Sequence, residues 1–344
     1  MTVSEIAKIA GVSTGTVDRV VHNRGRVSEE TRQKILKIIE ENGYKPDPIA
    51  RFLKKKGDFK IGVLIPSVSE ESGYWQEIYD GIAGACESDY ASFGFKLEPY
   101  EFKRPDRNSL NEQFKKMVAS DCAAFIIAPV MQEEILFLLS EAKTSVPYCF
   151  VDSSVPGSDP LCAATQNPLS AGFLAAKITR LFAKGQGTFA AIKPFSESFN
   201  LNERSRGFEE YFSETKSDKA ILKIARGGEK KHIYQAVDSL VKECPDLRGV
   251  CIVNSEGHFV GERIAALGLK DKIAVTGFDL VPSNKDAIKS GKIDALISQD
   301  PKGQGQAVMK EIYKKIVLQS DAQKIINMPL DIYFKENIME GENL

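Results

Sequence analysis

Over the first 44 residues, apolar positions recur at the three- and four-residue spacing of short amphipathic helices. Thr2 and Glu5 have the pattern of a capping box for a first helix, and Gly11 suits the left-handed turn that would end it. Ser13 and Ser28 stand where they could cap a second and a third helix. The expected inward faces are Ile6, Ala7, Ile9 and Ala10, then Val17, Val20 and Val21 within 14–21, and then Ile35, Ile38 and Ile39 before a stop at Asn42-Gly43.

A different pattern begins at Phe59, where short apolar runs alternate with amphipathic stretches. Such alternation indicates an α/β fold, with a parallel sheet covered by helices on both faces. Roughly 285 residues is long for one such sheet, so two similar Rossmann-like lobes are expected. Strands are predicted at 59–66, 95–102, 122–129, 147–152, 187–192, 220–225, 249–254, 273–279 and 294–298. Helices are predicted at 77–93, 109–119, 131–143, 168–183, 204–213, 231–243 and 261–269, with another starting near KGQGQ (302–306).

Charge is divided unevenly between these two parts. Residues 1–56 hold twelve Lys or Arg against seven Asp or Glu, a net charge of +5, and the whole chain holds 46 against 47, so the remainder carries −6. A basic end on a near-neutral protein suits a polyanion. Helix, glycine turn and helix is also the helix-turn-helix arrangement, whose second helix enters the major groove of DNA. The pattern alone also fits any small three-helix bundle, but the charge favours DNA.

Three segments, AGVSTGTVDRV, VSEETRQKI and NGYKPDPIARFL, resemble the DNA-binding head of the LacI/GalR family of bacterial transcription regulators, through residues 2–53. The resemblance implies that Thr14, Gly15 and Arg19 face the bases, and the planar fork of Arg19 suits guanine O6 and N7. A solvated surface charge is the alternative for Arg19. Gly15 has no side chain and Asp18 stands where the family commonly has Ser, so the operator sequence cannot be read. The resemblance also places at the DNA Ser13, Thr16, His22, Asn23, Arg26, Ser28, Ala50 and Leu53.

Between the head and the large domain, the chain is expected to form a hinge. Asp47 suits an N-cap and Pro48 suits the first position of a helix, but so short a helix is not stable alone in water. It is therefore expected to fold only on DNA. The resemblance implies that Leu53 is a wedge pushed into the minor groove. Packing of Leu53 and Phe52 on the large domain is the alternative.

Polar residues close several of the expected strands, and in open parallel sheets ligands bind at the carboxyl ends of strands. Carboxylates and amides hydrogen-bond to hydroxyls, arginine makes paired hydrogen bonds, and tryptophan stacks on the weakly apolar face of a sugar. The set predicts a neutral, monosaccharide-like ligand, although any one member could instead be only a cap or turn former. The residues are Trp75 after the first strand, Asp152, Asn254, Asp279 and Gln299 at strand ends, and Arg204 at the start of a helix.

From about Ile61 to Phe334 the chain also resembles the ribose-type sugar receptors, which have the type I periplasmic-binding-protein fold. The resemblance implies that Tyr74 and Trp75 sandwich the sugar ring, and in the RSRGF segment it favours Arg204 over Arg206. Ser153 stands where the ribose-type receptors carry an arginine, so the sugar is not identified. The remaining sugar contacts implied by the resemblance are Asp152, Asn254, Asp279 and Gln299.

These patterns predict a division of the chain into three parts. The head spans 1–46, the hinge 47–57 and the ligand-binding domain 58–344. Within the last, one lobe is expected from 58–163 with 300–325, and the other from 164–299 with 326–340.

What the sequence lacks narrows the function. It has no signal-peptide pattern at its start and no apolar stretch of membrane-spanning length. Its six cysteines are scattered and its three histidines lie far apart, and it has no phosphate loop, nucleophile elbow or dinucleotide fingerprint. We therefore expect a cytoplasmic protein away from the membrane, with no cofactor, no metal and no enzymatic activity.

The resulting hypothesis is a transcription repressor that binds a double-stranded DNA operator as a homodimer and responds to a sugar-like effector. Three alternatives stay open. The effector could be a nucleobase, sugar acid or sugar phosphate. The chain could be a sugar transport receptor, which the basic head argues against. It could also be a sugar-modifying enzyme that uses Asp152 and Asp279 as an acid pair.

Overall fold

The computed structural model describes residues 1–21, 24–44, 59–69, 73–196, 198–213, 218–225 and 227–338. The predicted hinge, with Ala50 and Leu53, lies outside these ranges, and so do His22 and Asn23. The described chain divides into two compact units, a head within residues 1–44 and a large domain from Phe59 onward.

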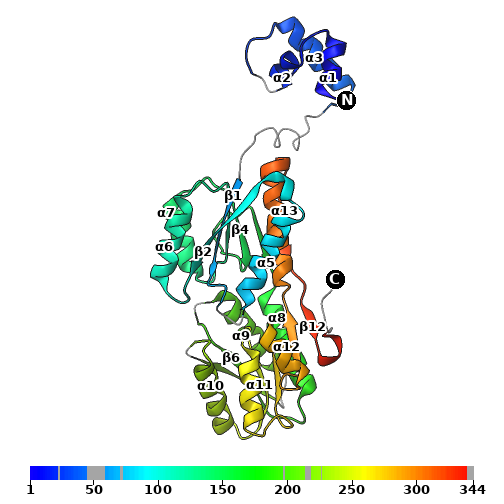
Figure 1. The fold of residues 1–344 in the computed structure, drawn as a ribbon. Helices are drawn as coiled ribbons and strands as arrows, with labels where there is room; N and C mark the ends of the chain where they lie inside the picture. Colours follow the sequence, from blue (N-terminus) through cyan, green and yellow to red (C-terminus); the bar gives the residue numbers. More distant parts are fainter. Residues whose placement is uncertain are drawn as a thin grey trace. The chain divides into compact units, whose positions relative to one another are not determined.

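The head consists of three helices, α1 (Val3–Ala10), α2 (Thr14–Val21) and α3 (Glu29–Glu41) (Figure 1). The predicted capping box is confirmed, because the Thr2 N–H donates to Glu5 Oε2 over 2.7 Å and the Glu5 N–H donates to Thr2 Oγ1 over 3.3 Å. Gly11 ends α1 in the left-handed region, at φ 70°. Ser13 and Ser28 each accept a hydrogen bond from the backbone N–H three residues on, as predicted for N-caps.

A small apolar core joins the three helices. Ile6, Val17 and Ile35, one from each helix, are fully buried. The prediction that Ile9 faces this core is wrong, because its side chain is 56% exposed. The buried stripe of α1 runs from Ile6 to Ala7, and at about 100° per residue Ile9 lies about 160° around the helix from Ala7.

The large domain contains two six-stranded sheets, one in each of two lobes (Figure 1). The strand order is β11-β5-β4-β3-β1-β2 in the first lobe and β12-β10-β9-β8-β6-β7 in the second. The pairs are parallel apart from β10 with β12, which confirms the predicted pair of parallel sheets. The strands are β1 (Phe59–Pro66), β2 (Phe95–Phe102), β3 (Ala124–Ile127), β4 (Tyr148–Asp152), β5 (Cys162–Thr165), β6 (Thr188–Lys193), β7 (Lys219–Ile224), β8 (Leu247–Ile252), β9 (Ala274–Phe278), β10 (Ala295–Ser298), β11 (Ile325–Asn327) and β12 (Asp331–Tyr333).

Helices cover both faces of each sheet. In the first lobe α5 packs against α13, and in the second α8 packs against α9. Residues along β6 alternate between two apolar cores: Phe189 and Ala191 face α8 and α9, whereas Ala190 and Ile192 face α10, α11 and α12. The helices are α5 (Tyr74–Glu87), α6 (Arg107–Val118), α7 (Gln132–Ala142), α8 (Pro168–Phe182), α9 (Phe199–Ser213), α10 (Lys230–Glu243), α11 (Gly257–Ala266), α12 (Pro282–Lys289) and α13 (Pro301–Tyr313), with short helical turns at Ala91–Phe93, Lys314–Leu318 and Lys335–Asn337.

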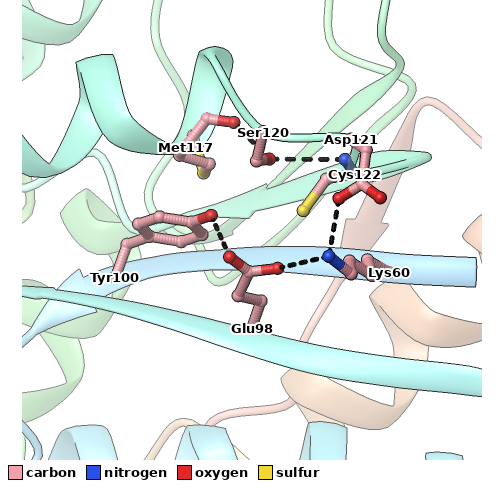
Figure 2. Close-up of polar contacts among 7 residues, drawn as sticks. All are labelled: Lys60, Glu98, Tyr100, Met117, Ser120, Asp121 and Cys122. Carbon is pink, nitrogen blue, oxygen red and sulfur yellow. Dashed lines mark hydrogen bonds and ion pairs between the residues drawn. The ribbon is translucent and has the colours of Figure 1, made fainter.

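A polar cluster joins neighbouring strands where the first sheet begins (Figure 2). Lys60 Nζ on β1 lies 2.7 Å from Asp121 Oδ1 and 3.7 Å from Glu98 Oε2 on β2, and the Tyr100 hydroxyl donates to Glu98 over 2.6 Å. These pairs are accessible to water, so they contribute little to stability. They link β1 to β2 and to the loop before β3, at the point where the large domain starts.

Some elements differ from the prediction. The strands β5, β11 and β12 are absent from the prediction, because runs of three or four residues give too short a pattern. The eight-residue helix α12 is also absent from it. Strand β11 pairs with β5 in the first sheet, residues 325–327 against residues 163–165. Helix α9 begins at Phe199, five residues before the predicted start at Arg204. The prediction placed the start too late because Asn200 and Asn202, in the first turn, are residues typical of loops.

Candidate functional site

In the head, α2 presents two different faces. Val17 and Val20 point into the core, and the opposite face is open to solvent. That exposed face carries the side chain of Arg19, and Gly15 leaves a gap in it. Ser13, which caps α2, also bonds to the Thr16 hydroxyl over 2.9 Å, so the start of the helix is fixed. Of the predicted DNA-contacting residues in the described chain, those exposed are Ser13, Thr14, Gly15, Arg19, Arg26 and Ser28, with Thr16 half-buried.

The stem of Arg19 rests on the turn that follows α2. A Cβ added to Gly25 would lie 3.4 Å from Arg19 Cδ, and Gly25 adopts φ 70°. The glycine therefore gives the Arg19 stem a backbone surface to pack on. The side chain of Arg19 is exposed to solvent.

In the large domain, the seven side chains predicted to bind a ligand line one cavity between the two lobes, which we call the inner cavity. Tyr74 and Trp75 start α5, Asp152 ends β4, and Arg204 lies in the second turn of α9. The free volume is about 20 Å³, room for about one water molecule. The full lining is Tyr74, Trp75, Arg104, Val130, Asp152, Ser198, Asn200, Leu201, Arg204, Asn254, Ser255, Asp279 and Gln299.

On the first-lobe side, Asp152 is the centre of a hydrogen-bond network. Its Oδ1 accepts from the Tyr74 hydroxyl over 2.8 Å, and its backbone N–H donates to Gln304 Oε1 over 2.6 Å. Gln304 Nε2 in turn donates to the carbonyl of Gln299 over 3.0 Å. Asn200 Nδ2, from the second lobe, reaches Asp152 Oδ2 over 3.1 Å. The carboxylate is thus fixed by groups from both lobes.

On the second-lobe side, the buried guanidinium of Arg204 is held by three groups. It donates to the Val253 carbonyl over 2.9 Å and to Gln299 Oε1 over 2.6 Å, and it lies 4.3 Å from the centre of the Phe278 ring. With the Gln166 amide turned so that its oxygen faces Arg204, that oxygen accepts from Nε over 3.1 Å. Gln299 Nε2 in turn donates to both carboxylate oxygens of Asp279, over 3.2 and 3.3 Å.

A close approach of helices makes this position of Arg204 possible. A Cβ added to Gly172 on α8 would lie 2.1 Å from the Arg204 carbonyl oxygen, so a larger residue there would push α9 away. Asn284, fully buried on α12, supports the wall from behind, since its Nδ2 donates to the carbonyls of Ser255, Phe278 and Asp279. The strand ends that carry the site are therefore rigidly placed.

Burial changes the ionisation of the site. The Asp279 carboxyl is almost fully buried, and burial raises its pKa to about 8 despite the opposing effects of Arg204 and Gln299. Burial, and then the charge of Asp152, also raise the pKa of the Tyr74 hydroxyl well above its usual value. Asp152 and Asp279 both adopt φ 67°, a left-handed conformation that is uncommon for residues other than glycine. Such backbone strain is typical of functional sites.

The aromatic pair does not form the expected sandwich. The Tyr74 and Trp75 rings contact each other edge to face, with centroids 5.0 Å apart and planes at 76°. No sugar ring fits between them, because the two rings are in direct contact. The Trp75 indole N–H is buried and meets no acceptor within the part of the chain that the structure describes.

Sequence reasoning missed several residues of the site. Arg104 lies two residues beyond the end of β2, so the predicted strand end could have indicated it, whereas Asn200 lies in the first turn of α9, away from a strand end. Gln304 and Asn284 act from behind the cavity wall. Within the described ranges, no group of three or more His, Cys, Asp or Glu side chains is placed to hold a metal ion. Likewise, no described helix has the length and hydropathy needed to cross a membrane.

Two family models match the chain. Residues 61–319 match the periplasmic binding protein domain, and residues 2–47 match the lacI family of bacterial regulatory proteins. A solved structure of a putative LacI transcriptional regulator from Bacteroides fragilis shares the fold, with a TM-score of 0.75 and 22% identity over 82% of this chain and 99% of that one.

Curated relatives include two repressors. The chain is 28% identical to the HTH-type transcriptional repressor PurR of Aliivibrio fischeri over 60% of its own length, and it spans 59% of that repressor. It is 24% identical to the ribose operon repressor of Halalkalibacterium halodurans, over 82% of this chain and 81% of the relative.

Proposed function

Because the chain belongs to the lacI family of bacterial regulatory proteins and carries a periplasmic-binding-protein domain, we propose that it is a transcription repressor controlled by a small ligand. The ligand would bind in the inner cavity and change the affinity of the head for an operator in double-stranded DNA. The relatives are named as repressors, which favours regulation without turnover over an enzyme.

One observation supports this proposal above the others. Seven side chains from six separate segments of the chain, and from both lobes, converge on one buried cavity. A ligand that contacts both lobes stabilises their closed arrangement, because it binds that arrangement better than an open one. A two-lobed domain with such a site can convert ligand binding into a change of shape.

The groups of the cavity favour a neutral polyhydroxy ligand, such as a monosaccharide or a derivative. Trp75 offers an N–H that meets no acceptor among the described residues, and Asp279, with its raised pKa, can donate as well as accept at neutral pH. Asn254 adds an amide to the lining. Hydroxyl groups, which donate and accept, match such a mixed set, whereas a phosphate only accepts.

The exposed face of α2 suits the major groove, and Arg19 is the group that we place at a guanine. Two heads in a homodimer would read a pseudo-palindromic operator, with the two-fold axis of the protein on that of the DNA. The protein would act in the cytoplasm, where the DNA lies. Each phosphate contact releases counterions, so operator affinity should fall steeply with salt.

Ligand and operator would then be coupled. Closure of the lobes would weaken operator binding, so the ligand acts as an inducer, and the operator must weaken ligand binding by the same factor. A hundredfold effect needs only about 2.7 kcal/mol of differential binding.

A thermal-shift screen tests the effector class, since a specific ligand raises the melting temperature. The screen should include monosaccharides, sugar acids, sugar phosphates and nucleobases, with each hit then tested on operator binding. Neutral sugars are expected to give the hits. Hits confined to sugar phosphates or nucleobases would contradict the proposed effector class but not the regulator.

A further inference from the structure

A second and larger cavity lies in the same cleft, and we call it the outer cavity. Its volume is about 410 Å³, and residues of both lobes line it. The first lobe contributes the beginnings of helices α6 and α7 to the lining, and the second lobe contributes the beginning of α9. The lining residues are Pro105, Arg107, Met131, Gln132, Glu133, Glu134, Ser196, Phe199 and Asn202.

The two cavities are consecutive parts of one cleft. Arg104, Val130 and Ser198 line the inner cavity, and their immediate neighbours Pro105, Met131 and Phe199 line the outer one. At the boundary the guanidinium of Arg104, from the first lobe, lies over the ring of Phe195, from the second lobe, at 4.3 Å from its centre. A ligand bound in the inner cavity could therefore extend past this pair.

The outer cavity combines apolar and polar groups in the way a sugar site does. Phe199 and Met131 offer apolar surface, while Gln132 and Asn202 offer amides. Asn202 is held in place, because its Oδ1 accepts from Lys193 Nζ over 2.7 Å and its Nδ2 donates to the Ser196 carbonyl over 3.0 Å.

Charge in the outer cavity argues for a neutral occupant. Arg107 lies 3.8 Å from Glu134, so its charge is offset within the cavity. Glu133 adds a second carboxylate to the lining. With Arg104 at the boundary and Lys193 bonded to Asn202, the charges in and beside the cavity nearly balance, so a charged ligand has no strong electrostatic advantage there. A neutral sugar unit would gain a strong acceptor for its hydroxyls in Glu133.

We propose that the effector contains two linked sugar units, one bound in the inner cavity and the other in the outer cavity. This inference rests on the proposed function, because it takes the inner cavity as the effector site. The outer cavity, at about 410 Å³, falls within the roughly 300–1,000 Å³ of small-molecule sites. The inner cavity, at about 20 Å³, must widen to admit a sugar ring, whereas the outer cavity already has room for its unit.

Isothermal titration calorimetry on the full chain tests this with matched sugar pairs. The pairs are D-glucose with cellobiose, D-galactose with lactose, D-mannose with mannobiose and D-xylose with xylobiose. In at least one pair the disaccharide is expected to bind at least about tenfold more tightly than its monosaccharide, which corresponds to about 1.4 kcal/mol. Glu133→Ala and Phe199→Ala should each reduce that preference to about threefold or less. Glu141→Ala, at the other end of α7 and outside the lining, is the matched control and should keep it.

The outcomes separate this inference from the function it rests on. If monosaccharides bind as tightly as disaccharides, the outer cavity is only an entrance, and the sugar-controlled repressor stands. A disaccharide preference that survives both Glu133→Ala and Phe199→Ala also overturns the placement of the second unit. If no sugar of either kind binds to protein that still binds operator, the sugar effector fails together with this inference.

Discussion

The side-chain amide of Asn200, in the second lobe, donates to the carbonyl and to the carboxylate of Asp152, in the first lobe, over 2.7 and 3.1 Å. Both residues are buried in the inner cavity. These bonds form only when the lobes are close together, and one partner is a predicted ligand contact. The pair therefore links ligand recognition to lobe closure.

Asn200→Ala should weaken the ligand response by removing this link. A buried hydrogen bond to a charged group contributes about 1.5–3 kcal/mol, so ligand affinity should fall by at least about tenfold. Asn108→Ala, an exposed asparagine on α6, is the control and should bind ligand normally. Titration calorimetry with the best sugar from the screen is the measurement. Normal ligand affinity in Asn200→Ala would show that the bonds between Asn200 and Asp152 do not link ligand recognition to lobe closure.

Arg204 and Arg206 lie two residues apart on α9 and offer a matched pair of variants. Arg204 is buried and holds Val253 and Gln299, whereas Arg206 is exposed and pairs with Glu203 at the surface. Arg204→Ala should abolish the ligand response and lower the free energy of unfolding by about 3 kcal/mol, because it leaves buried acceptors unpaired. Arg206→Ala should leave both unchanged.

Operator binding with and without ligand measures the ligand response of these two variants, and thermal melts measure their stability. Arg204→Lys, which keeps the charge but loses the fork, serves where the alanine variant is unstable. A normal ligand response in any well-folded Arg204 variant would remove Arg204 from the site.

Asp279 should make stability depend on pH. Its pKa is raised to about 8 in the folded protein, against 3.8 for an ordinary aspartate. Its stabilising contribution is therefore complete below about pH 4 and is lost as pH rises through 8, because the unfolded chain ionises first. In Asp279→Asn this group cannot ionise, so the variant should gain melting temperature relative to the natural protein between pH 4 and 8. Calorimetric melts across that range check the sign, and parallel curves would place the carboxylate in an unperturbed environment.

Arg19 should set operator discrimination. Arg19→Ala is expected to lower the preference for operator over random DNA by about 1–3 kcal/mol, the usual value of a bidentate guanine contact. Lys34→Ala, which removes an exposed charge from α3, should weaken binding to both DNAs alike. Fluorescence anisotropy at two salt concentrations distinguishes the two effects. Equal loss on both DNAs in Arg19→Ala would make Arg19 a phosphate contact.

Much of this architecture could be predicted because strands and caps follow local rules. The caps at Thr2, Ser13 and Ser28 depend on residues within one helical turn, and the polar residues at strand ends, such as Asp152 and Asp279, follow from the direction of parallel strands. The remainder depends on tertiary contacts. Nothing near Gln304 or Asn200 in the sequence indicates that these amides meet Asp152. The edge-to-face contact between Tyr74 and Trp75 could not be predicted either, since adjacency in sequence does not fix the angle between two rings.

The central claim is that a sugar-like ligand bound through Arg204 in the inner cavity sets how tightly the head holds its operator. The most direct test is operator affinity, measured by anisotropy on a DNA fragment selected by the natural protein, with and without the best sugar of the screen. We expect the sugar to lower operator affinity at least about tenfold in the natural protein and to have no effect in the Arg204→Ala variant. Equal operator affinity with and without every sugar that binds, or an equal sugar effect in both proteins, would contradict it.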